Sequence, residues 1–278
     1  VLLANNRMKL IDCFMYFDDD LVLDIRLNTL NKYVDRFVIA EATLDHAGNK
    51  KQLNFDIKKF IKFKDRISYI VVEDMPKNVE GVKKNWHPAH IRDQFQRNAL
   101  ERGYKNFDDT DLIMISDVDE IPNPKKISEF KIKNKYASFI QKNFQAKINQ
   151  LNVTEEKWVG TKICQKKYLR SPQWLRNFKN KKRKFWQFYK DKEPQVILDG
   201  GWHFSFLKDY KSIQRKIHSF AHQEFNKEAL TDIKQIEERV NSGTDIFDRK
   251  YKYKKIKLDD QFPNYIIENK LKFKDWIL

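Results

Sequence analysis

The sequence predicts an α/β fold with a mostly parallel central sheet, antiparallel additions and C-terminal helices. Short apolar runs alternate with helical patterns in the first half of the chain, as in strands joined by helical crossovers. After Pro124 the strand-like runs are longer and more mixed, which is typical of antiparallel strands. The 278 residues, 41% of them hydrophobic, suffice for a single domain with a sizeable core.

Four runs in the first half are short and rich in Ile, Val, Phe or Met, as buried parallel strands are. They are Leu10 to Phe17, Arg36 to Ala40, Ile67 to Val72 and Asp111 to Ser116. Between the first two runs, Leu23, Leu27, Leu30 and Val34 recur at helical spacing and predict a helix.

A second helix is predicted to begin at Pro88, a residue that suits the first helical position, and to end at Gly103 as a left-handed stop. One face of this helix is apolar, with Ile91, Phe95 and Ala99. The other face carries Arg92 and Arg97. A solvated charged stripe is the ordinary interpretation of such arginines, and a ligand-binding role is the alternative.

The second half is predicted to contain three stretches of strand and two helices. The strands lie within Tyr136 to Leu151, Trp158 to Gln165 and Gln195 to Leu207. The helices run from Tyr210 to Phe220 and from Ala229 to Val240, and Gly243 terminates the second.

The charge balance favours an anionic partner. The chain has 55 Lys and Arg against 39 Asp and Glu, a net charge of +16, which suits nucleic acid, an acidic membrane surface or a phosphorylated small molecule. Two cysteines, Cys13 and Cys164, exclude a disulfide framework and a four-thiolate metal site. With no long apolar run and no signal-like start, we expect a cytoplasmic protein, with membrane association as an additional option.

Aromatic and basic residues are interleaved from Trp174 to Lys190. Such a segment can stack on bases or lie at a membrane interface, so a peripheral membrane contact is one interpretation. The other interpretation is an exposed basic loop beside buried aromatic side chains.

The segment from Asp111 to Pro122 is the most informative. An apolar strand is followed by Asp117, Asp119 and Glu120, at the strand edge where open α/β sheets bind ligands. Residues two apart in an extended chain point the same way, so Asp117 and Asp119 can hold one hard divalent cation. Such a cation would stabilise a departing diphosphate as a Lewis acid. The alternative is that the acids only cap the short helix that begins at Pro124.

Two further clusters contain histidines. Gly200 and Gly201 precede Trp202 and His203, and His203 can complete a metal's ligand set or bind a phosphate, although a core histidine is the common alternative. His218, His222 and Glu224 have a spacing that can bind zinc. They lack the Glu directly after the first His that a metalloprotease helix carries, which argues against zinc hydrolysis.

In this order the blocks of the chain resemble glycosyltransferase family 17. The blocks are Ile11 to Phe17, Asp24 to Leu30, Tyr33 to Glu41, Gln96 to Asn98 with Arg102 and Gly103, Ser116 to Pro122, Gly201 to Ser205 and His222 to Phe247. The resemblance implies a GT-A fold (Rossmann-like), a divalent cation, Mn²⁺ or Mg²⁺, inversion at the anomeric carbon, and UDP-N-acetylglucosamine as donor. It implies that Asp117 and Asp119 are the metal and diphosphate motif.

On this interpretation residues 8–123 form the nucleotide-sugar-binding half, and residues 124–278 form the acceptor-side half with the C-terminal helices. Asp117, Asp119 and His203 are the predicted metal ligands, and the acceptor is a glycan or polysaccharide. The donor is predicted to contact one set of side chains, and the catalytic base is predicted to be Glu224 or Glu120. The predicted donor contacts are Glu41, Arg92, Arg97, Asp117, Gly201, Trp202 and His203.

Two other classes compete with a transferase. A phosphatase or phosphotransferase of the haloacid dehalogenase kind also has two Asp two residues apart, but its motif normally ends in Thr and lies on the first strand. Here Ile121 and three earlier strands argue against it. A basic nucleic-acid-binding protein is suggested by the charge of +16 and by Trp174 to Lys190, but biased base composition also enriches Lys, so nucleic acid is the less favoured partner.

Overall fold

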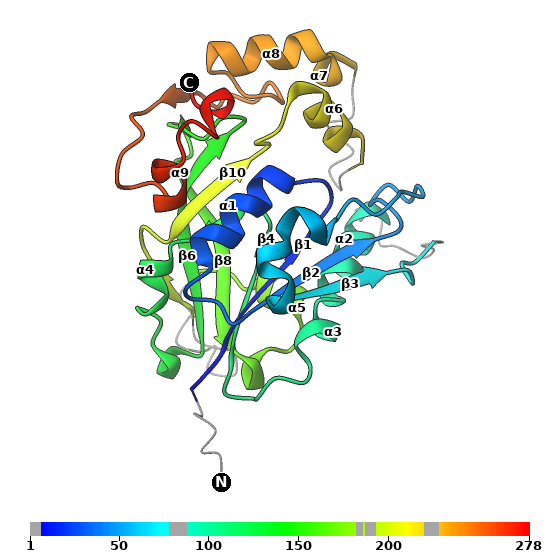
Figure 1. Cartoon of the computed structure of the whole chain (residues 1–278), viewed down its shortest axis with the longest axis vertical. Coiled ribbons are helices and arrows are strands. Elements are labelled where there is room, and N and C mark those ends of the chain that lie inside the picture. The colour runs from blue at the N-terminus through cyan, green and yellow to red at the C-terminus, as the bar shows by residue number, and fades with distance from the viewer. Residues whose placement is uncertain (1–6, 78–87, 182–185, 187–192, 220–227) are drawn as a thin grey trace.

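The computed structural model describes residues 7–77, 88–181, 186, 193–219 and 228–278 (Figure 1). The strands among these residues are β1 (Leu10–Met15), β2 (Arg36–Ala42), β3 (Ile67–Val72), β4 (Leu112–Asp117), β5 (Glu120–Pro122), β6 (Tyr136–Gln145), β7 (Gln150–Asn152), β8 (Lys157–Gln165), β9 (Gln195–Ile197), β10 (Gly201–Ser205) and β11 (Tyr253–Lys255).

The α-helices are α1 (Asp20–Leu30), α2 (Pro88–Asn98), α3 (Glu101–Tyr104), α4 (Pro124–Ile127), α5 (Pro172–Asn177), α6 (Tyr210–Ser219), α7 (Glu228–Thr231), α8 (Ile233–Ser242) and α9 (Asn264–Glu268). Short 3₁₀ helices are η1 (Ile57–Arg66), η2 (Ile132–Asn134), η3 (Lys166–Tyr168) and η5 (Lys274–Trp276). No helix in these described ranges is long and apolar enough to span a bilayer.

All the described strands belong to one mixed sheet, in the main order β11-β7-β6-β8-β4-β1-β2-β3. The neighbours β3, β2, β1 and β4 are parallel, as predicted. Beyond β4 the sheet is not mostly parallel: β8 pairs antiparallel with both β4 and β6, whereas β10 is parallel to β6 and antiparallel to β5. The short connections between β6, β7 and β8 cannot form parallel crossovers, which need a dozen or more residues.

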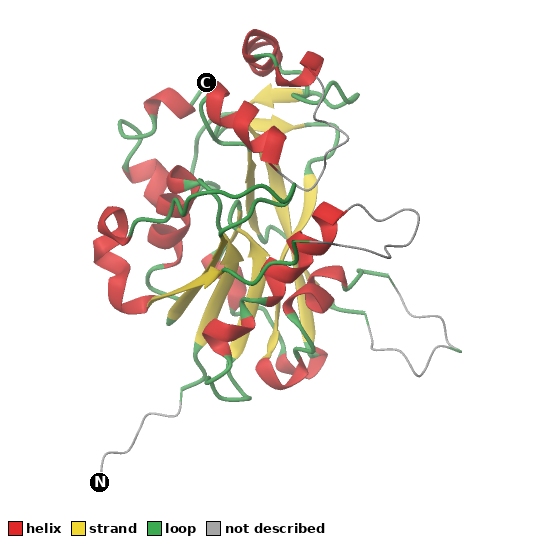
Figure 2. Ribbon diagram, turned by 90° about the vertical axis from the view of Figure 1, so that its right-hand side faces the viewer, coloured by secondary structure: helices red, strands yellow, loops and turns green. Residues whose placement is uncertain are grey.

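The two faces of the parallel strands carry separate apolar layers, because successive side chains of a strand point to opposite faces. Phe14 and Met114 pack with α1 and the C-terminal segment around α9. Cys13 and Ile113 pack with α2, α3 and α5 on the other face. Figure 2 shows helices on both sides of the strands. Cys13 and Cys164 are both free and buried.

The predicted ends of several elements are confirmed. The four parallel strands lie within two residues of their predicted bounds, and Gly243 caps α8 with a left-handed φ of 70°. Gly103 is an exception. The helix α2 ends at Asn98, and Gly103 lies inside α3, where a Cβ would stand 2.3 Å from Cγ1 of Val38. Gly103 therefore permits close packing of α3 on β2 and is not a helix stop.

A third apolar cluster holds α6 beside the carboxyl ends of the parallel strands. Ile213 and Ile217 on α6 pack against Ile236 and Val240 on α8, and Phe206 joins them from the end of β10. The polar side of α6 is consequently held close to the turns that follow β1 and β4.

Candidate active site

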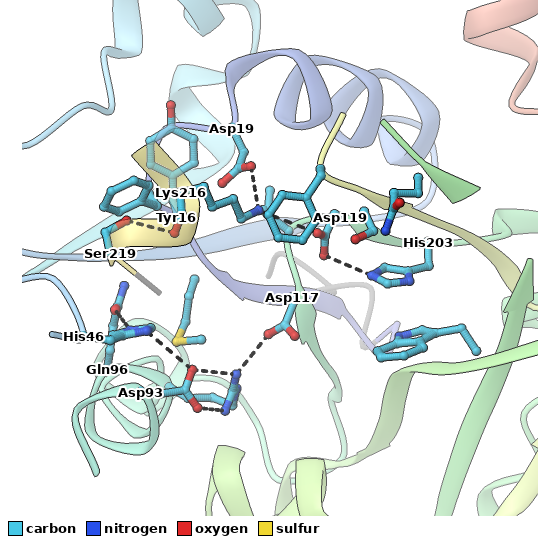
Figure 3. Close-up of a pocket in the computed structure, with 18 of the residues that line it drawn as sticks. Tyr16, Asp19, His46, Asp93, Gln96, Asp117, Asp119, His203, Lys216 and Ser219 are labelled. Carbon is cyan, nitrogen blue, oxygen red and sulfur yellow. Dashed lines mark hydrogen bonds and ion pairs between the residues drawn. The ribbon is translucent and has the colours of Figure 1, made fainter. Parts of the chain in front are cut away.

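A cavity of about 700 Å³ lies at the carboxyl ends of β1, β2 and β4. This is the edge at which open α/β sheets bind ligands, and the volume suits a small-molecule site. Both halves of the chain line it, with Asp117 to Asp119 between them. Figure 3 shows Asp117, Asp119 and His203 facing this space.

The turn that carries the acids is held by a buried arginine on α1. Arg26 has no exposed surface and donates to the carbonyl oxygens of Asp117, Val118 and Glu120, at 3.1, 3.1 and 2.9 Å. Its charge is balanced by Asp12, 2.6 Å away on β1. Val118 turns into the core, as the alternation predicts, so Asp117 and Asp119 both reach the cavity.

Asp117 is compensated by two guanidinium groups. Arg97 contacts its Oδ1 and Arg176 its Oδ2, each at 3.0 Å. Arg97 is itself paired with Asp93 at 2.7 Å. Burial raises the pKa of Asp117, but the coulombic effect of Arg176 and Arg97 outweighs it and holds this pKa well below its usual range. Asp117 is thus a stable anion that orients two arginines at the cavity wall.

Asp119 has much weaker partners. Its nearest side-chain nitrogen atoms of Lys, Arg or His in the described part of the chain are Nζ of Lys216 and Nε2 of His203, both at 3.8 Å. Burial raises the pKa of Asp119 above its usual value, and Lys216 and His203 only partly oppose this effect. The arrangement leaves a buried carboxylate short of close positive charge, a state that a bound cation would relieve.

His203 is oriented by groups on its other side. Its Nδ1 lies 3.1 Å from Oδ1 of Asn143, and its ring stacks on Trp158 with centroids 4.4 Å apart. With Nδ1–H donated to the Asn143 oxygen, the Nε2 lone pair points toward Asp119, which is the tautomer that a metal-ligating histidine adopts.

Asp119 and His203 together fit a divalent cation as two protein ligands. No group of three His, Cys, Asp or Glu in the described ranges is arranged to hold a metal. Two protein ligands are sufficient for Mg²⁺-type sites, in which water and substrate phosphates occupy the other positions.

Glu120 is fully buried and lies outside the cavity lining. It accepts hydrogen bonds from Nε1 of Trp158 at 2.7 Å and from the backbone N–H of Asp117 at 3.1 Å, and it is ion-paired with Arg176. The predicted role as catalytic base is not favoured by this environment. Its carboxylate instead lies behind the cavity wall and holds two side chains of that wall, Trp158 and Arg176.

A model of glycosyltransferase family 17 matches residues 2–276. The chain belongs to glycosyltransferase family 17. A similar solved structure is the apo form of WbbM, a bifunctional glycosyltransferase, with 10% sequence identity and a TM-score of 0.31. That match covers 60% of this chain and 33% of the other, so the chain spans about a third of its length. Comparison with curated proteins gives no match.

Two predicted donor contacts of the transferase do not line the cavity but hold loops that do. Glu41 has no exposed surface, and it accepts from Nζ of Lys51 at 2.5 Å and from the backbone N–H of Asn54 at 2.8 Å. Arg92 donates to the carbonyls of His46 and two other residues, at 3.1, 3.0 and 2.9 Å. Lys51 and His46 reach the cavity in their place.

Gly201 and Trp202 also lie outside the cavity of the transferase. Gly201 has a φ of 136°, and a Cβ there would stand 2.1 Å from the carbonyl oxygen of Ile121, so it permits the pairing of β10 with β5. Trp202 points to the opposite face from His203 and donates to the carbonyl of Gln261 at 2.9 Å. Of this predicted group on β10, His203 alone lines the cavity.

Sequence reasoning missed several residues of the site. Lys216 on α6 lies 3.1 Å from Asp19 and 3.8 Å from Asp119, as Figure 3 shows. Burial lowers the pKa of Lys216, but Asp19 and Asp119 outweigh this and keep it cationic. Arg176 belongs to the segment interpreted as a surface element, and His46 belongs to no motif. Neither position has a local signal, because the partners are distant in sequence.

Two further predictions fall on segments that the structure describes in part or not at all. Glu224 and His222 lie outside the described residues, so their roles stay predictions. The basic aromatic segment is described only at residues 174–181 and 186. There Trp174 and Phe178 are half-buried, and Trp174 packs on Tyr136 and Phe178 with centroids 5.2 and 5.3 Å apart, whereas Trp186 is exposed, so both interpretations of the segment stay predictions. The acids do not cap α4, since that cap is Asn123.

Proposed function

We propose that this family 17 member is an inverting, metal-dependent transferase of the GT-A type. It would transfer N-acetylglucosamine from UDP-N-acetylglucosamine to a glycan or polysaccharide. The observation that carries the proposal is Asp119, a largely buried carboxylate, 13% exposed, at the carboxyl edge of the sheet, with Nζ of Lys216 and Nε2 of His203 each 3.8 Å away. The parallel order β3-β2-β1-β4 supports a Rossmann-like donor half.

Asp119 and His203 would hold Mn²⁺ or Mg²⁺. When bound, the cation supplies Lewis-acid stabilisation of the diphosphate leaving group. His203 would be kept in the required tautomer by Asn143, and its ring would be held by stacking on Trp158. Asp117 is also a predicted ligand, but both of its oxygens are engaged by arginines, so we assign it to orienting them.

The charged wall around Asp117 suits the diphosphate. Arg97, Arg176 and Lys216 all line the cavity, and planar guanidinium groups match phosphate oxygens. The uridine would lie along the rim of the first half, against loops that Glu41 and Arg92 hold. Residues 8–123 would thus form most of the donor site, while the second half contributes Arg176, His203 and Lys216.

The reaction would be a single displacement. A carboxylate removes the proton of an acceptor hydroxyl, the oxygen attacks the anomeric carbon, and the bond to the diphosphate breaks on the opposite side. Inversion follows from this geometry. The donor sugar is taken from the family resemblance, and the cavity does not itself select it.

Thermal unfolding with UDP and Mn²⁺ tests the proposal. Saturating UDP with Mn²⁺ is expected to raise the Tm by roughly 5 °C, beyond the effect of either alone, because both bind the native state together. Asp119→Asn should remove the increment that Mn²⁺ adds. The absence of any joint stabilisation, with strong salt-sensitive RNA binding in its place, would defeat the transferase assignment and support a nucleic-acid-binding protein.

A further inference from the structure

One part of the cavity wall, contributed by the second half of the chain, has a different composition. It is formed by the turn between β7 and β8 with the start of β8, by the end of β10, and by the segment before β11 with the start of β11. Five aromatic residues line it, together with the carboxylate of Glu155. The aromatic residues are Trp158, Phe206, Phe247, Tyr251 and Tyr253.

The aromatic side chains of this wall are fixed by contacts behind them. Phe206 and Phe247 pack edge to face with centroids 5.3 Å apart. The hydroxyl of Tyr253 donates to Asp245 at 3.0 Å, and the guanidinium of Arg249 lies 4.6 Å from the ring centroid of Tyr251. Fixed aromatic faces beside polar groups suit the C–H face of a pyranose ring, because the negative face of the ring attracts polarised C–H groups.

Apart from the proposed metal ligand Asp119, the other carboxylates of the cavity differ from Glu155 in having close partners. Asp19 is paired with Lys208 at 2.9 Å, Asp93 with Arg97 at 2.7 Å, and Asp117 with two arginines. Asp45 accepts the backbone N–H groups of its own turn. The side chain of Glu155 is exposed and lines the cavity, and the phenol of Tyr251 is a neighbouring donor group.

The backbone at Glu155 is pinned next to the proposed metal ligand. Its N–H donates to Oδ1 of Asn152 at 2.8 Å, and its carbonyl accepts from Nδ2 of Asn143 at 3.1 Å. Asn143 is the same residue that orients His203 at 3.1 Å. Asn143 therefore links Glu155 to His203. The turn that carries Glu155 is held by hydrogen bonds on both sides.

Tyr251 supports this carboxylate as a neutral donor. The hydrogen bond to Glu155 raises the pKa of Tyr251 above its usual value, so the phenol keeps its proton throughout the neutral range. A neighbouring phenol that keeps its proton can donate to a carboxylate and cannot accept a proton in its place.

We propose that Glu155 is the general base of the transfer and that the aromatic wall around it is the subsite for a pyranose acceptor. This assignment rests on the proposed function. The acceptor O–H gives its proton to a carboxylate oxygen of Glu155, and its oxygen forms the new bond to the anomeric carbon. The bond from that carbon to the diphosphate breaks, and its electron pair leaves with UDP.

Hydrolysis of UDP-N-acetylglucosamine by the full chain tests the assignment, since water replaces the unknown acceptor. Glu155→Gln should slow the release of UDP about 10²- to 10⁴-fold. Sodium azide should restore turnover in this variant to within about tenfold of wild type and yield a glycosyl azide, because azide is already an anion and needs no base. Glu156→Gln removes the same charge from the neighbouring exposed residue and should change the rate less than about twofold.

Three results would overturn the assignment. Glu155→Gln could hydrolyse the donor at the wild-type rate, it could lose activity without rescue by azide, or Glu224→Gln could show the azide-rescued loss instead. Joint stabilisation by UDP and Mn²⁺, measured on each variant, should stay at the wild-type value. If the wild type shows neither that stabilisation nor release of UDP, the transferase proposal itself fails, which is a different result from the failure of Glu155 alone.

Discussion

Two regions of the cavity differ in how they treat a carboxylate. Around Asp117 the chain supplies two guanidinium groups at 3.0 Å, whereas around Asp119 the nearest ammonium and imidazole nitrogen atoms in the described ranges lie at 3.8 Å. Both aspartates come from one turn and face one cavity. Two residues of a DxD motif therefore need not share one role: the first is balanced by the protein, and the second has a charge that a bound cation would balance.

The strongest effect should be on turnover. Asp119→Asn should slow the release of UDP about 10³-fold and abolish the stimulation by Mn²⁺, because it removes a proposed metal ligand. Asp117→Asn should slow the release of UDP about tenfold, because the arginines lose their orientation but keep their charge. Initial rates with and without Mn²⁺ measure both effects, and a larger loss in Asp117→Asn would reverse the roles of the two aspartates.

The next effect should be on stability, through Arg26, which supports the turn that carries both aspartates. Arg26→Leu should lower the free energy of unfolding by about 3–5 kcal/mol, because it leaves Asp12 as an unpaired buried charge and frees the carbonyls of the acidic turn. Urea denaturation measures this quantity. Arg7→Ala is the matched control: Arg7 pairs with Asp35 on the surface, so the change should be below about 1 kcal/mol. Equal effects would contradict a supporting role for Arg26.

A smaller effect on stability should distinguish Asp117 from Asp119 in the metal-free protein. The folded pKa of Asp117 is lowered, so its charge stabilises the fold above the unfolded pKa, and this stability is lost as the pH falls through the folded value. The folded pKa of Asp119 is raised, so its charge costs stability at neutral pH, and the cost disappears as the pH falls through that higher value.

At pH 7 in EDTA, Asp117→Asn should therefore destabilise the protein and Asp119→Asn should stabilise it, each on the order of 1 kcal/mol. The side chain of Asp117 is 36% exposed, so solvent screening limits its share. Both changes in the free energy of unfolding should become smaller as the pH is lowered toward 3. Urea midpoints at several pH values decide the signs, and a destabilised Asp119→Asn would show that its charge is balanced by groups other than a cation.

The weakest effect concerns the acceptor wall. Tyr251→Phe should slow hydrolysis of the donor about threefold to tenfold, since the phenol donor beside Glu155 is lost. Azide should remove most of this deficit, which a merely structural role would not explain. A loss that azide does not change would place Tyr251 outside the path of the proton.

The sequence predicts those features that depend on neighbours in the chain. The four parallel strands, the acids at the end of β4 and the Gly243 cap all follow local patterns. Glu41 and Arg92 show where this reasoning fails, because their residue types and positions are visible in the sequence but the loops that occupy those side chains are not. Arg26 and Arg176 contact the acidic turn from positions up to 94 and 59 residues away in the chain, which no local pattern reveals.

The sequence alone is enough to correct one of the predicted donor contacts. Trp202 and His203 are adjacent in a strand, so their side chains point to opposite faces, and only one of them can reach the cavity. The antiparallel pairs that β6, β7 and β8 form beyond β4 are predicted from the longer, more mixed runs after Pro124, and the short connections between these strands agree with that prediction.

The contrast between the two aspartates depends on a catalytic cation held by Asp119 and His203. A crystal structure of the complex with UDP and Mn²⁺, with anomalous scattering to locate manganese, tests this point most directly. We predict a manganese peak about 2.0–2.3 Å from a carboxylate oxygen of Asp119 and from Nε2 of His203, with Asp117 still between its arginines. Nucleotide bound in the cavity with manganese away from both side chains would contradict it.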